Sequence, residues 1–266
     1  MRKFQWIFSG LIAFAVTAAI VISWATRTSL DTVDTITYES IPRPDFSSFT
    51  NVTEKKQAFF DYMLPSVRQA NDQVLKDRKR VLGWQQSYEA GGNLPDRELK
   101  QLNSLATKYE IDSELSTEQK LELLALRADM IPASLALAQA AKESGWGTSR
   151  FSRDANNFFG EWCYSEGCGL VPNRRVEGAT HEVRAFDAVD DSIAAYIHNL
   201  NTHPPYRNLR ELRAEMRDAG KITGIALAQG LSRYSQRGPV YIGEVQSIIR
   251  VNELQPLDRP LETATE

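Results

Sequence analysis

The segment that most constrains this chain is Ile131–Arg150, which reads IPASLALAQAAKESGWGTSR. Between Ala133 and Ala141 nearly every residue is small or apolar, and a helix that is apolar all round is a buried helix. Pro132 suits the first turn of such a helix, where a missing N–H costs nothing, and Gly145 suits its left-handed end. The sequence therefore predicts a helix that is buried within the fold and ends near Gly145.

Glu143 lies in the last turn of this predicted helix, next to Lys142 and shortly before Trp146. Burial disfavours the charged form of a carboxyl, and so does the negative end of the helix dipole. Both effects raise the pKa of Glu143, as a general acid that works near neutral pH requires. The competing interpretation is a solvated helix-end residue paired with Lys142, which is the usual state of a glutamate. The expected burial of the helix favours the functional interpretation.

Three motifs along the chain carry a resemblance to a known family. Ala138–Ser149 resembles the catalytic-helix motif of the bacterial glucosaminidases, the endo-β-N-acetylglucosaminidases of glycoside hydrolase family 73, which cut peptidoglycan. Asn157–Gly160 matches the N-x-F-G segment of that family. Arg184–Asp187, followed by Ser192 and Tyr196, resembles its strand-to-helix passage.

Two further features resemble the Bax-type branch of the same family. One is the insertion that contains Cys163 and Cys168, and the other is the run Thr202–Tyr206. The resemblance covers about residues 117–251, roughly one domain's worth of chain. It implies a glycoside hydrolase with an α+β fold that is mainly helical: a lysozyme-like helical domain with a small β-hairpin lobe.

The stretch 156–186 loses helical periodicity, and glycines separate its short runs, so it predicts a small antiparallel lobe with a turn near Glu177–Gly178. Glycoside hydrolysis usually needs a second carboxylate as base or nucleophile, and the resemblance places it in this lobe. The candidates are Glu166, Glu177 and Glu182. We place Glu177 first because it lies at the predicted hairpin tip. An N-acetylated sugar can instead use its own acetamido oxygen, and then no second carboxylate is needed.

Flat aromatic side chains suit the apolar face of a pyranose ring, and several of them lie in the matched region. Tyr234 resembles the tyrosine of the family's Tyr-Ala-Thr-Asp motif, although here Ser235–Arg237 follow and the aspartate is missing. For each aromatic residue, packing in the core is the competing interpretation. We assign substrate contact to Gln139, a polar residue within the apolar helix, and to the aromatic residues Trp146, Phe158, Trp162, Tyr196 and Tyr234.

Cys163 and Cys168 are the only cysteines, and both lie in the predicted β lobe. In an oxidising compartment they are expected to form a local disulfide. The competing interpretation is a zinc site, which needs about two more suitable ligands. The chain has 3 histidines, and His198 and His203 are poorly spaced for one helix face. We therefore expect neither a metal nor another cofactor.

The N-terminal segment 1–25 is predicted to be a membrane anchor. Arg2 and Lys3 precede an uncharged, mostly apolar run, Phe4–Ala25, which is long enough to cross a bilayer as a helix. The positive charges place the start in the cytoplasm and the rest of the chain outside it, which predicts a single-pass protein of the bacterial inner membrane with a periplasmic domain. The alternative is a signal peptide cleaved after Ser23–Ala25, which would leave a secreted or periplasmic protein.

Four further segments complete the predicted organisation. Residues 26–53 are rich in serine and threonine and are expected to be a flexible tether. Residues 54–115 are expected to be a helical bracing region, in which Pro65 would kink or divide the first helix. Ser116 and Gln119 predict a capping box at the start of the glucosaminidase domain, 116–253. Residues 254–266 lack a core pattern and are expected to be a loose tail.

The leading hypothesis is a peptidoglycan hydrolase that cuts the glycan strand at N-acetylglucosamine, with Glu143 as general acid. The enzymatic alternative is a lytic transglycosylase, which works with one acid and no added water. The alternative from another class is a non-catalytic peptidoglycan-binding or assembly factor on the same fold, since fold alone does not determine function. The net charge of −3 provides no basic field for nucleic acid, so none is expected as a partner.

Overall fold

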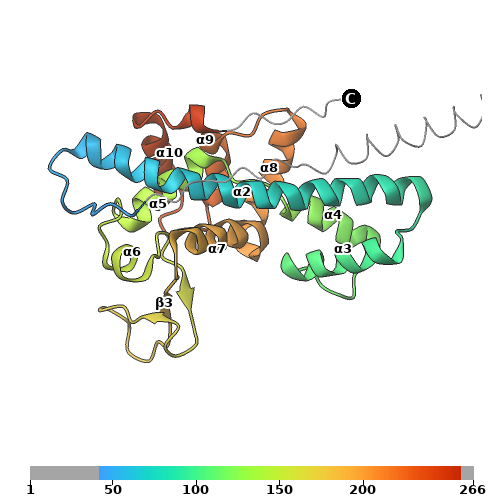
Figure 1. Ribbon diagram of the computed structural model, residues 1–266, viewed down its shortest axis with the longest axis horizontal. Helices are drawn as coiled ribbons and strands as arrows, with labels where there is room; N and C mark the ends of the chain where they lie inside the picture. Colours follow the sequence, from blue (N-terminus) through green and yellow to red (C-terminus); the bar gives the residue numbers. More distant parts are fainter. Residues whose placement is uncertain (1–41, 259–266) are drawn as a thin grey trace, which may run out of the picture. The chain divides into compact units, whose positions relative to one another are not determined.

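The computed structural model describes residues 42–258. The predicted anchor and most of the predicted tether lie outside the described residues. Within 42–258, no helix is long and apolar enough to cross a bilayer. The helices are α2 (Val52–Gly91), α3 (Asp96–Lys108), α4 (Thr117–Arg127), α5 (Ala133–Ser144), α6 (Arg150–Ala155), α7 (Val189–Thr202), α8 (Arg207–Asp218), α9 (Gly224–Leu227) and α10 (Pro239–Val251), with the short 3-10 turns η1 (Pro204–Tyr206), η2 (Ala228–Leu231) and η3 (Gln255–Leu257) (Figure 1).

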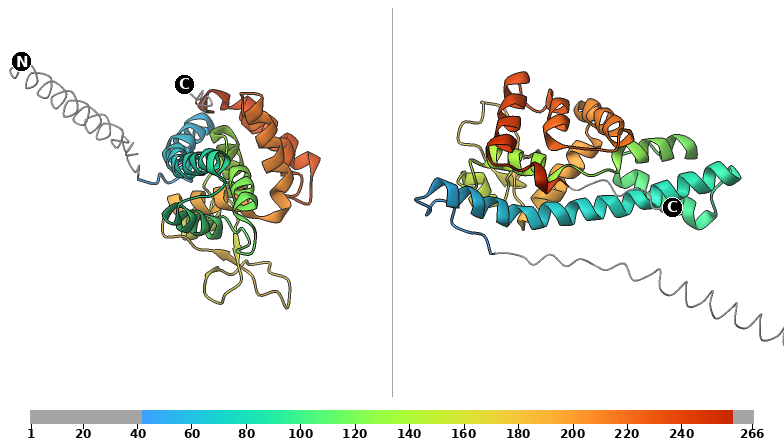
Figure 2. Two further views of the ribbon diagram at one scale, coloured as in Figure 1. Left: turned by 90° about the vertical axis from the view of Figure 1, so that its right-hand side faces the viewer. Right: turned by 90° about the horizontal axis from the view of Figure 1, so that it is seen from above.

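The fold class is confirmed as mainly helical α+β with a small β lobe. The lobe is a three-stranded antiparallel sheet in the order β1 (Trp162–Cys163), β3 (Glu182–Arg184), β2 (Gly169–Leu170). Both outer strands pair with the same residue of β3, because Trp162 and Leu170 lie opposite Val183. The predicted turn at Glu177–Gly178 is present between β2 and β3. The lobe projects from the helical body in two views of the molecule (Figures 1 and 2).

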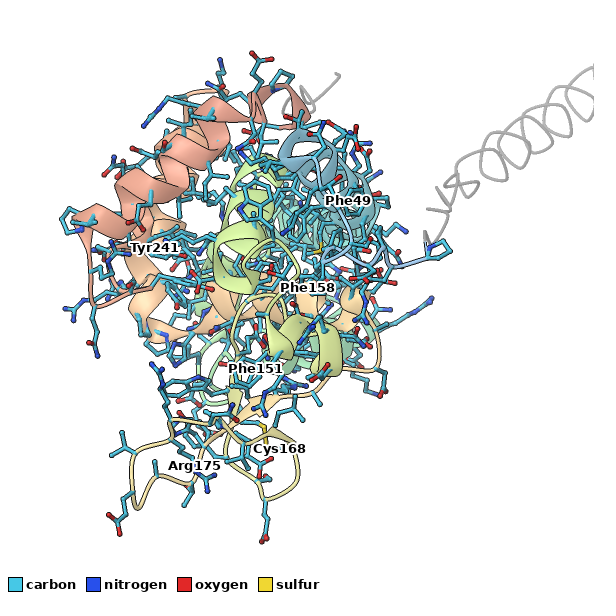
Figure 3. The ribbon with its side chains drawn as sticks, turned by 90° about the vertical axis from the view of Figure 1, so that its left-hand side faces the viewer. Phe49, Phe151, Phe158, Cys168, Arg175 and Tyr241 are labelled. Carbon is cyan, nitrogen blue, oxygen red and sulfur yellow. A yellow bond between two sulfur atoms is a disulfide. The ribbon has the colours of Figure 1, made fainter. Side chains whose placement is uncertain are left out.

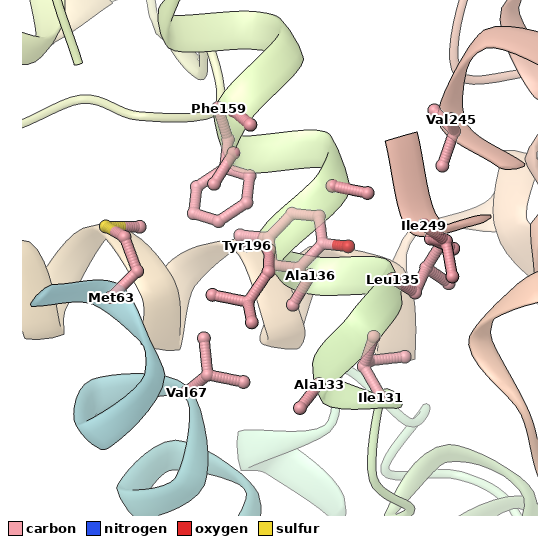
Figure 4. Close-up of a cluster of buried hydrophobic side chains, with 14 of the residues drawn as sticks. Met63, Val67, Ile131, Ala133, Leu135, Ala136, Phe159, Tyr196, Val245 and Ile249 are labelled. Atoms are coloured by element: carbon pink, nitrogen blue, oxygen red, sulfur yellow. The ribbon is translucent and has the colours of Figure 1, made fainter. Parts of the chain in front are cut away.

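The buried helix predicted from the sequence is α5. Its residues from Ala133 to Ala141 are all buried, and Gly145 ends it in the left-handed conformation, with φ 58°. Figure 4 shows α5 between α2, which contributes Met63 and Val67, and α10, which contributes Val245 and Ile249. Burial of one leucine or isoleucine side chain contributes about 1.5–3 kcal/mol, so this packing holds α5 in place.

The start of α5 is bound by the far end of the described chain. The carboxylate of Asp258 accepts hydrogen bonds from the N–H and the hydroxyl of Ser134, both at 2.9 Å, and from the N–H of Gly224. Leu254 is buried in the main core. Residues 254–258 are therefore packed on the domain, unlike the loose tail that the sequence predicts. Asp258 supplies the hydrogen bonds at the start of α5 that a local N-cap side chain would otherwise provide.

The long helix α2 joins two hydrophobic cores. Its first half packs on α5 and α7, whereas Val81 and Trp84 in its second half pack with α3 and α4 in a separate cluster. The helix continues through Pro65, so the expected division does not occur. The side chain of Asn51 caps its start, and the predicted capping box of Ser116 and Gln119 is present at the start of α4.

The segment before α2 is packed on the domain. The Phe46 ring lies 5.4 Å from the Phe59 ring, centroid to centroid. It also covers Gly147, where an added Cβ would come within 2.2 Å of the ring. Arg43 donates hydrogen bonds to the backbone oxygens of Ser152 and Arg153. The predicted tether extends to Thr53, but the chain is already attached to the domain at Arg43.

Asp129, between α4 and α5, is the centre of a buried ionic network. Its carboxylate accepts hydrogen bonds from Arg217 and lies 3.5 Å from Arg78, and its backbone oxygen accepts from Arg213. Burial alone would raise the pKa of Asp129, but the three arginines outweigh burial and lower it. The network joins α2 and α8 to the start of α5.

We expect Asp129→Asn to reduce the free energy of unfolding by about 3–5 kcal/mol, since it leaves buried arginines without their counter-charge. Urea unfolding with exposed Asp154→Asn as control measures this. Because the pKa of Asp129 is lowered in the folded state, its contribution is full above the unfolded pKa, about 4, and is lost as pH falls through the folded value. The difference between wild type and variant should therefore shrink in acid, and a difference independent of pH would contradict this assignment.

Candidate active site

Glu143 occupies the last turn of α5, where the buried helix reaches the surface. Its side chain is half-buried, and its Oε1 accepts a hydrogen bond of 2.8 Å from the hydroxyl of Tyr241 in α10. Lys142 forms its ion pair with Glu244 of α10. The solvated Glu143–Lys142 pair that competed with the functional interpretation is therefore not formed, and the carboxyl remains accessible at the edge of the helical body.

A buried chain of hydrogen bonds supports this carboxyl. The Tyr196 hydroxyl donates to Gln139 Oε1 at 2.6 Å, and Gln139 Nε2 donates to the Tyr241 hydroxyl at 2.9 Å. Tyr241 in turn donates to Glu143. Gln139, Tyr196 and Tyr241 are all buried, so the chain connects α7, α5 and α10 beneath the acid. It fixes Oε1 as the oxygen of Glu143 that accepts this hydrogen bond.

The electrostatics of Glu143 agree with the predicted direction. Burial is the largest effect and raises the pKa of Glu143, while the hydrogen bond from Tyr241 and the charge of Lys142 oppose it. Burial, followed by the charge of Glu143, raises the pKa of Tyr241 far above its usual range, so this hydroxyl stays protonated and remains a donor. The site therefore holds a carboxyl whose pKa is raised by burial, next to a hydroxyl that stays a hydrogen-bond donor.

The N-x-F-G segment forms a turn that is organised by Asn157. Its Oδ1 accepts hydrogen bonds from the N–H groups of Phe159, Gly160 and Glu161, and its Nδ2 donates to the backbone oxygens of Glu161 and Arg184. Gly160 has a positive φ of 71°, which a residue with a side chain rarely adopts. One buried amide therefore determines the direction in which the chain enters the β lobe.

The three glutamates considered as second carboxylates occupy different environments. Glu166 and Glu177 are exposed in turns of the β lobe. Glu182 is buried, and both of its oxygens accept backbone N–H groups, from Gly167 at 3.1 Å and Gly169 at 2.8 Å. Glu182 thus holds the loop that the disulfide Cys163–Cys168 closes, and this disulfide confirms the predicted pairing.

Glu161 is a carboxyl that sequence reasoning missed. It follows the Asn157 turn directly, and burial, only partly offset by Arg184, raises its pKa to about 7. Glu161 also lines a cavity of about 870 Å³ between α2, the start of the β lobe and α7. Glu143 does not line this cavity, so the two acids reach different parts of the surface. The position of Glu161 next to a matched motif was the one signal that could have pointed to it.

The comparisons with known proteins assign the chain to a family. A family model described as mannosyl-glycoprotein endo-β-N-acetylglucosaminidase, the glucosaminidase model, matches residues 121–254. "Protein bax" of Escherichia coli (strain K12) is 33% identical over 200 residues, which cover 74% of this chain and 70% of that protein. The chain belongs to the glucosaminidase family. It is therefore a glycoside hydrolase, and the predicted resemblance to the Bax-type branch is confirmed.

Two solved structures are also similar to this glucosaminidase. The catalytic domain of the autolysin Auto (Lmo1076) from Listeria monocytogenes gives a TM-score of 0.38 at 16% identity, and covers 66% of this chain and 96% of that one. A peptidoglycan hydrolase from Sphingomonas sp. A1 gives a TM-score of 0.35 at 28% identity, and covers 50% of this chain and 87% of that one.

The residues assigned to substrate contact divide into a buried and an accessible set. Gln139, Phe158 and Tyr196 are essentially inaccessible, so in this glucosaminidase they support the site from within. Figure 3 shows Phe158 inside the body, with Cys168 and Arg175 in the lobe and Tyr241 in α10. Trp162 is 57% exposed and stacks on His181 with ring centroids 4.2 Å apart, which makes it the most accessible aromatic candidate.

Trp146 and Tyr234 lie on the partly exposed border of the site. Trp146 packs edge-on against Phe59 and Phe60 of α2, and the Lys56 ammonium lies 5.0 Å from its ring centroid. Tyr234 stacks on Tyr241 at 5.3 Å and donates a hydrogen bond to the backbone oxygen of Phe159. Tyr234 therefore positions the tyrosine that binds Glu143. The motif resemblance located Tyr234 but not Tyr241.

We expect Tyr241→Phe to move the alkaline limit of activity to higher pH. The Tyr241 hydroxyl lowers the pKa of Glu143, so its removal raises that pKa, and a general acid is lost only when pH exceeds its pKa. The turnover number should fall about tenfold, as for a loss of about 1.4 kcal/mol. A pH–rate profile of both proteins measures the shift. An alkaline limit of activity that stays in place or moves to lower pH in Tyr241→Phe would contradict the role of Tyr241. The control is Tyr88→Phe, which lies in the distant second half of α2.

Proposed function

We propose that this glucosaminidase is a peptidoglycan hydrolase that cuts the glycan strand after N-acetylglucosamine, with Glu143 as its general acid. The single observation that carries the proposal is the half-buried Glu143 carboxyl, which is bound through one oxygen by Tyr241. The sequence resemblance to bacterial glucosaminidases that cut peptidoglycan supports the choice of substrate.

The proposed chemistry begins with proton transfer. Glu143 gives its proton to the glycosidic oxygen while the bond from that oxygen to the anomeric carbon breaks. The carboxylate that remains keeps the hydrogen bond from Tyr241, which stabilises its negative charge. The buried Gln139 and Tyr196 hold Tyr241 in the orientation that this requires. In one route the acetamido oxygen of the substrate closes on the anomeric carbon, and water then opens the oxazoline ring and returns a proton to the Glu143 carboxylate. In the other route water attacks the anomeric carbon directly and passes its proton to a second carboxylate.

We also propose a location for this chemistry. The segment Phe4–Ala25 would anchor the protein in the bacterial inner membrane, and the domain would lie in the periplasm. The disulfide Cys163–Cys168 supports an oxidising compartment. Intact mass measurement of the protein from the membrane and soluble fractions tests this proposal. Full-length mass in the membrane fraction supports the anchor, and a mass that lacks the N-terminal segment in the soluble fraction supports cleavage.

We expect Glu143→Gln to reduce the release of wall fragments by a factor of about 10²–10⁴, which is the usual contribution of a general acid. Purified peptidoglycan is digested with wild type, with Glu143→Gln and with Glu122→Gln, a surface control on α4. Mass spectrometry of the products should show N-acetylglucosamine at new reducing ends for the wild type and the control.

Two other outcomes would replace the proposal. Anhydro-muramic ends in the products would assign lytic transglycosylase chemistry to Glu143. Wild-type protein that binds the wall and releases no fragments would assign a non-catalytic binding or assembly role. Equal release by wild type and Glu143→Gln would remove Glu143 from the mechanism.

A further inference from the structure

Glu161 has a polar atom that the fold leaves unpaired. Its Oε1 is buried and has no hydrogen-bond partner among residues 42–258. Buried polar atoms of a folded protein are nearly always paired, and an unpaired one costs about 1–3 kcal/mol. Arg184 partly offsets the effect of burial on the pKa of this carboxyl, but among residues 42–258 no ion pair joins the two side chains. Residues 42–258 thus leave this oxygen without the partner that a buried polar atom usually has.

The backbone that carries Glu161 is held rigidly. The N–H of Glu161 donates to Asn157 Oδ1 at 3.1 Å, and its carbonyl accepts from Asn157 Nδ2 at 2.9 Å. The carbonyl also accepts from the N–H of Arg184 at 2.9 Å, which ties the turn to β3. The carboxyl therefore emerges from a fixed point, as a group that contacts a ligand must.

Glu161 is also reachable by a ligand. It lines the cavity of about 870 Å³ together with Trp162, Tyr164 and Arg184. Trp162 and Tyr164 are exposed, by 57% and 71% of their surface, and offer apolar ring faces beside the carboxyl. This combination of flat aromatic faces with a few polar groups suits a sugar ring.

Packing and hydrogen bonds connect the chain segment that carries Glu161 to Glu143. Phe159, two residues before Glu161, stacks on Tyr196 with ring centroids 3.9 Å apart, and Tyr196 begins the hydrogen-bond chain to Glu143. After burial, the charges of both glutamates raise the pKa of Tyr206, to about 12.

We infer that Glu161 is a further substrate-contacting residue, whose carboxyl lines the cavity and hydrogen-bonds a hydroxyl or acetamido group of a sugar that packs on Trp162. This inference rests on the proposed function, and it adds a second glycan-contacting region at the start of the β lobe, apart from Glu143. Glu161 is a different residue from the glutamates that the family resemblance suggested.

The test measures binding in the absence of turnover. Isothermal titration calorimetry uses a tetrasaccharide of alternating N-acetylglucosamine and N-acetylmuramic acid, with Glu143→Gln as the parent protein. We expect added Glu161→Ala to weaken binding at least tenfold. Added Glu161→Gln should retain more of the affinity than Ala, because an amide also donates and accepts hydrogen bonds. Added Glu122→Gln, the surface control, should bind like the parent.

Thermal melting of each variant shows whether the fold is intact, and Glu161→Gln keeps the shape of the side chain if Glu161→Ala does not fold. Binding by Glu161→Ala and Glu161→Gln that equals the parent would overturn the inference. The inference and the proposed function fail separately. Wild type that cuts peptidoglycan while Glu161 has no effect on binding refutes only the inference, and wild type that cuts nothing while binding depends on Glu161 refutes only the proposed reaction.

Discussion

The burial of α5 between α2 and α10 is the interaction on which the rest of the structure depends. A helix with no polar face cannot lie on a surface, so the other helices must surround it. Asp258 binds the start of α5, and the helix ends at Gly145 in the left-handed conformation. This end places Glu143 at the edge of the helical body. The same burial raises the pKa of that carboxyl, so packing and acid chemistry have one cause.

The polar groups inside the core turn this packing into a defined site. Gln139 is the buried polar residue through which tyrosines of α7 and α10 meet, and its amide can donate to one and accept from the other. The β lobe is attached in a comparable way, since the Asn157 side chain pairs five backbone groups in the turn that leads to it. Both devices use a single buried amide to hold elements that are distant in sequence.

The sequence predicted what local chemistry determines and missed what tertiary packing determines. The apolar run and Gly145 were enough to predict α5 and its end, and a matched motif located Glu143. Tyr241 could not be predicted, because only the packing of α10 on α5 brings it to Glu143. Phe158 and Tyr196 were assigned to substrate although they are core residues, since an aromatic side chain has the same pattern in both roles. The cap from Asp258 is equally non-local.

The measurement that tests this account most directly is the pKa of Glu143 itself. Glutamate side-chain carboxyl carbons labelled with ¹³C are followed by NMR through a pH titration, and comparison with Glu143→Gln assigns the resonance. The account predicts a pKa above the ordinary glutamate value of 4.5, because the carboxyl is carried by a buried helix. A pKa at or below that value would contradict it, since burial at the end of α5 would then not disfavour the charged carboxyl.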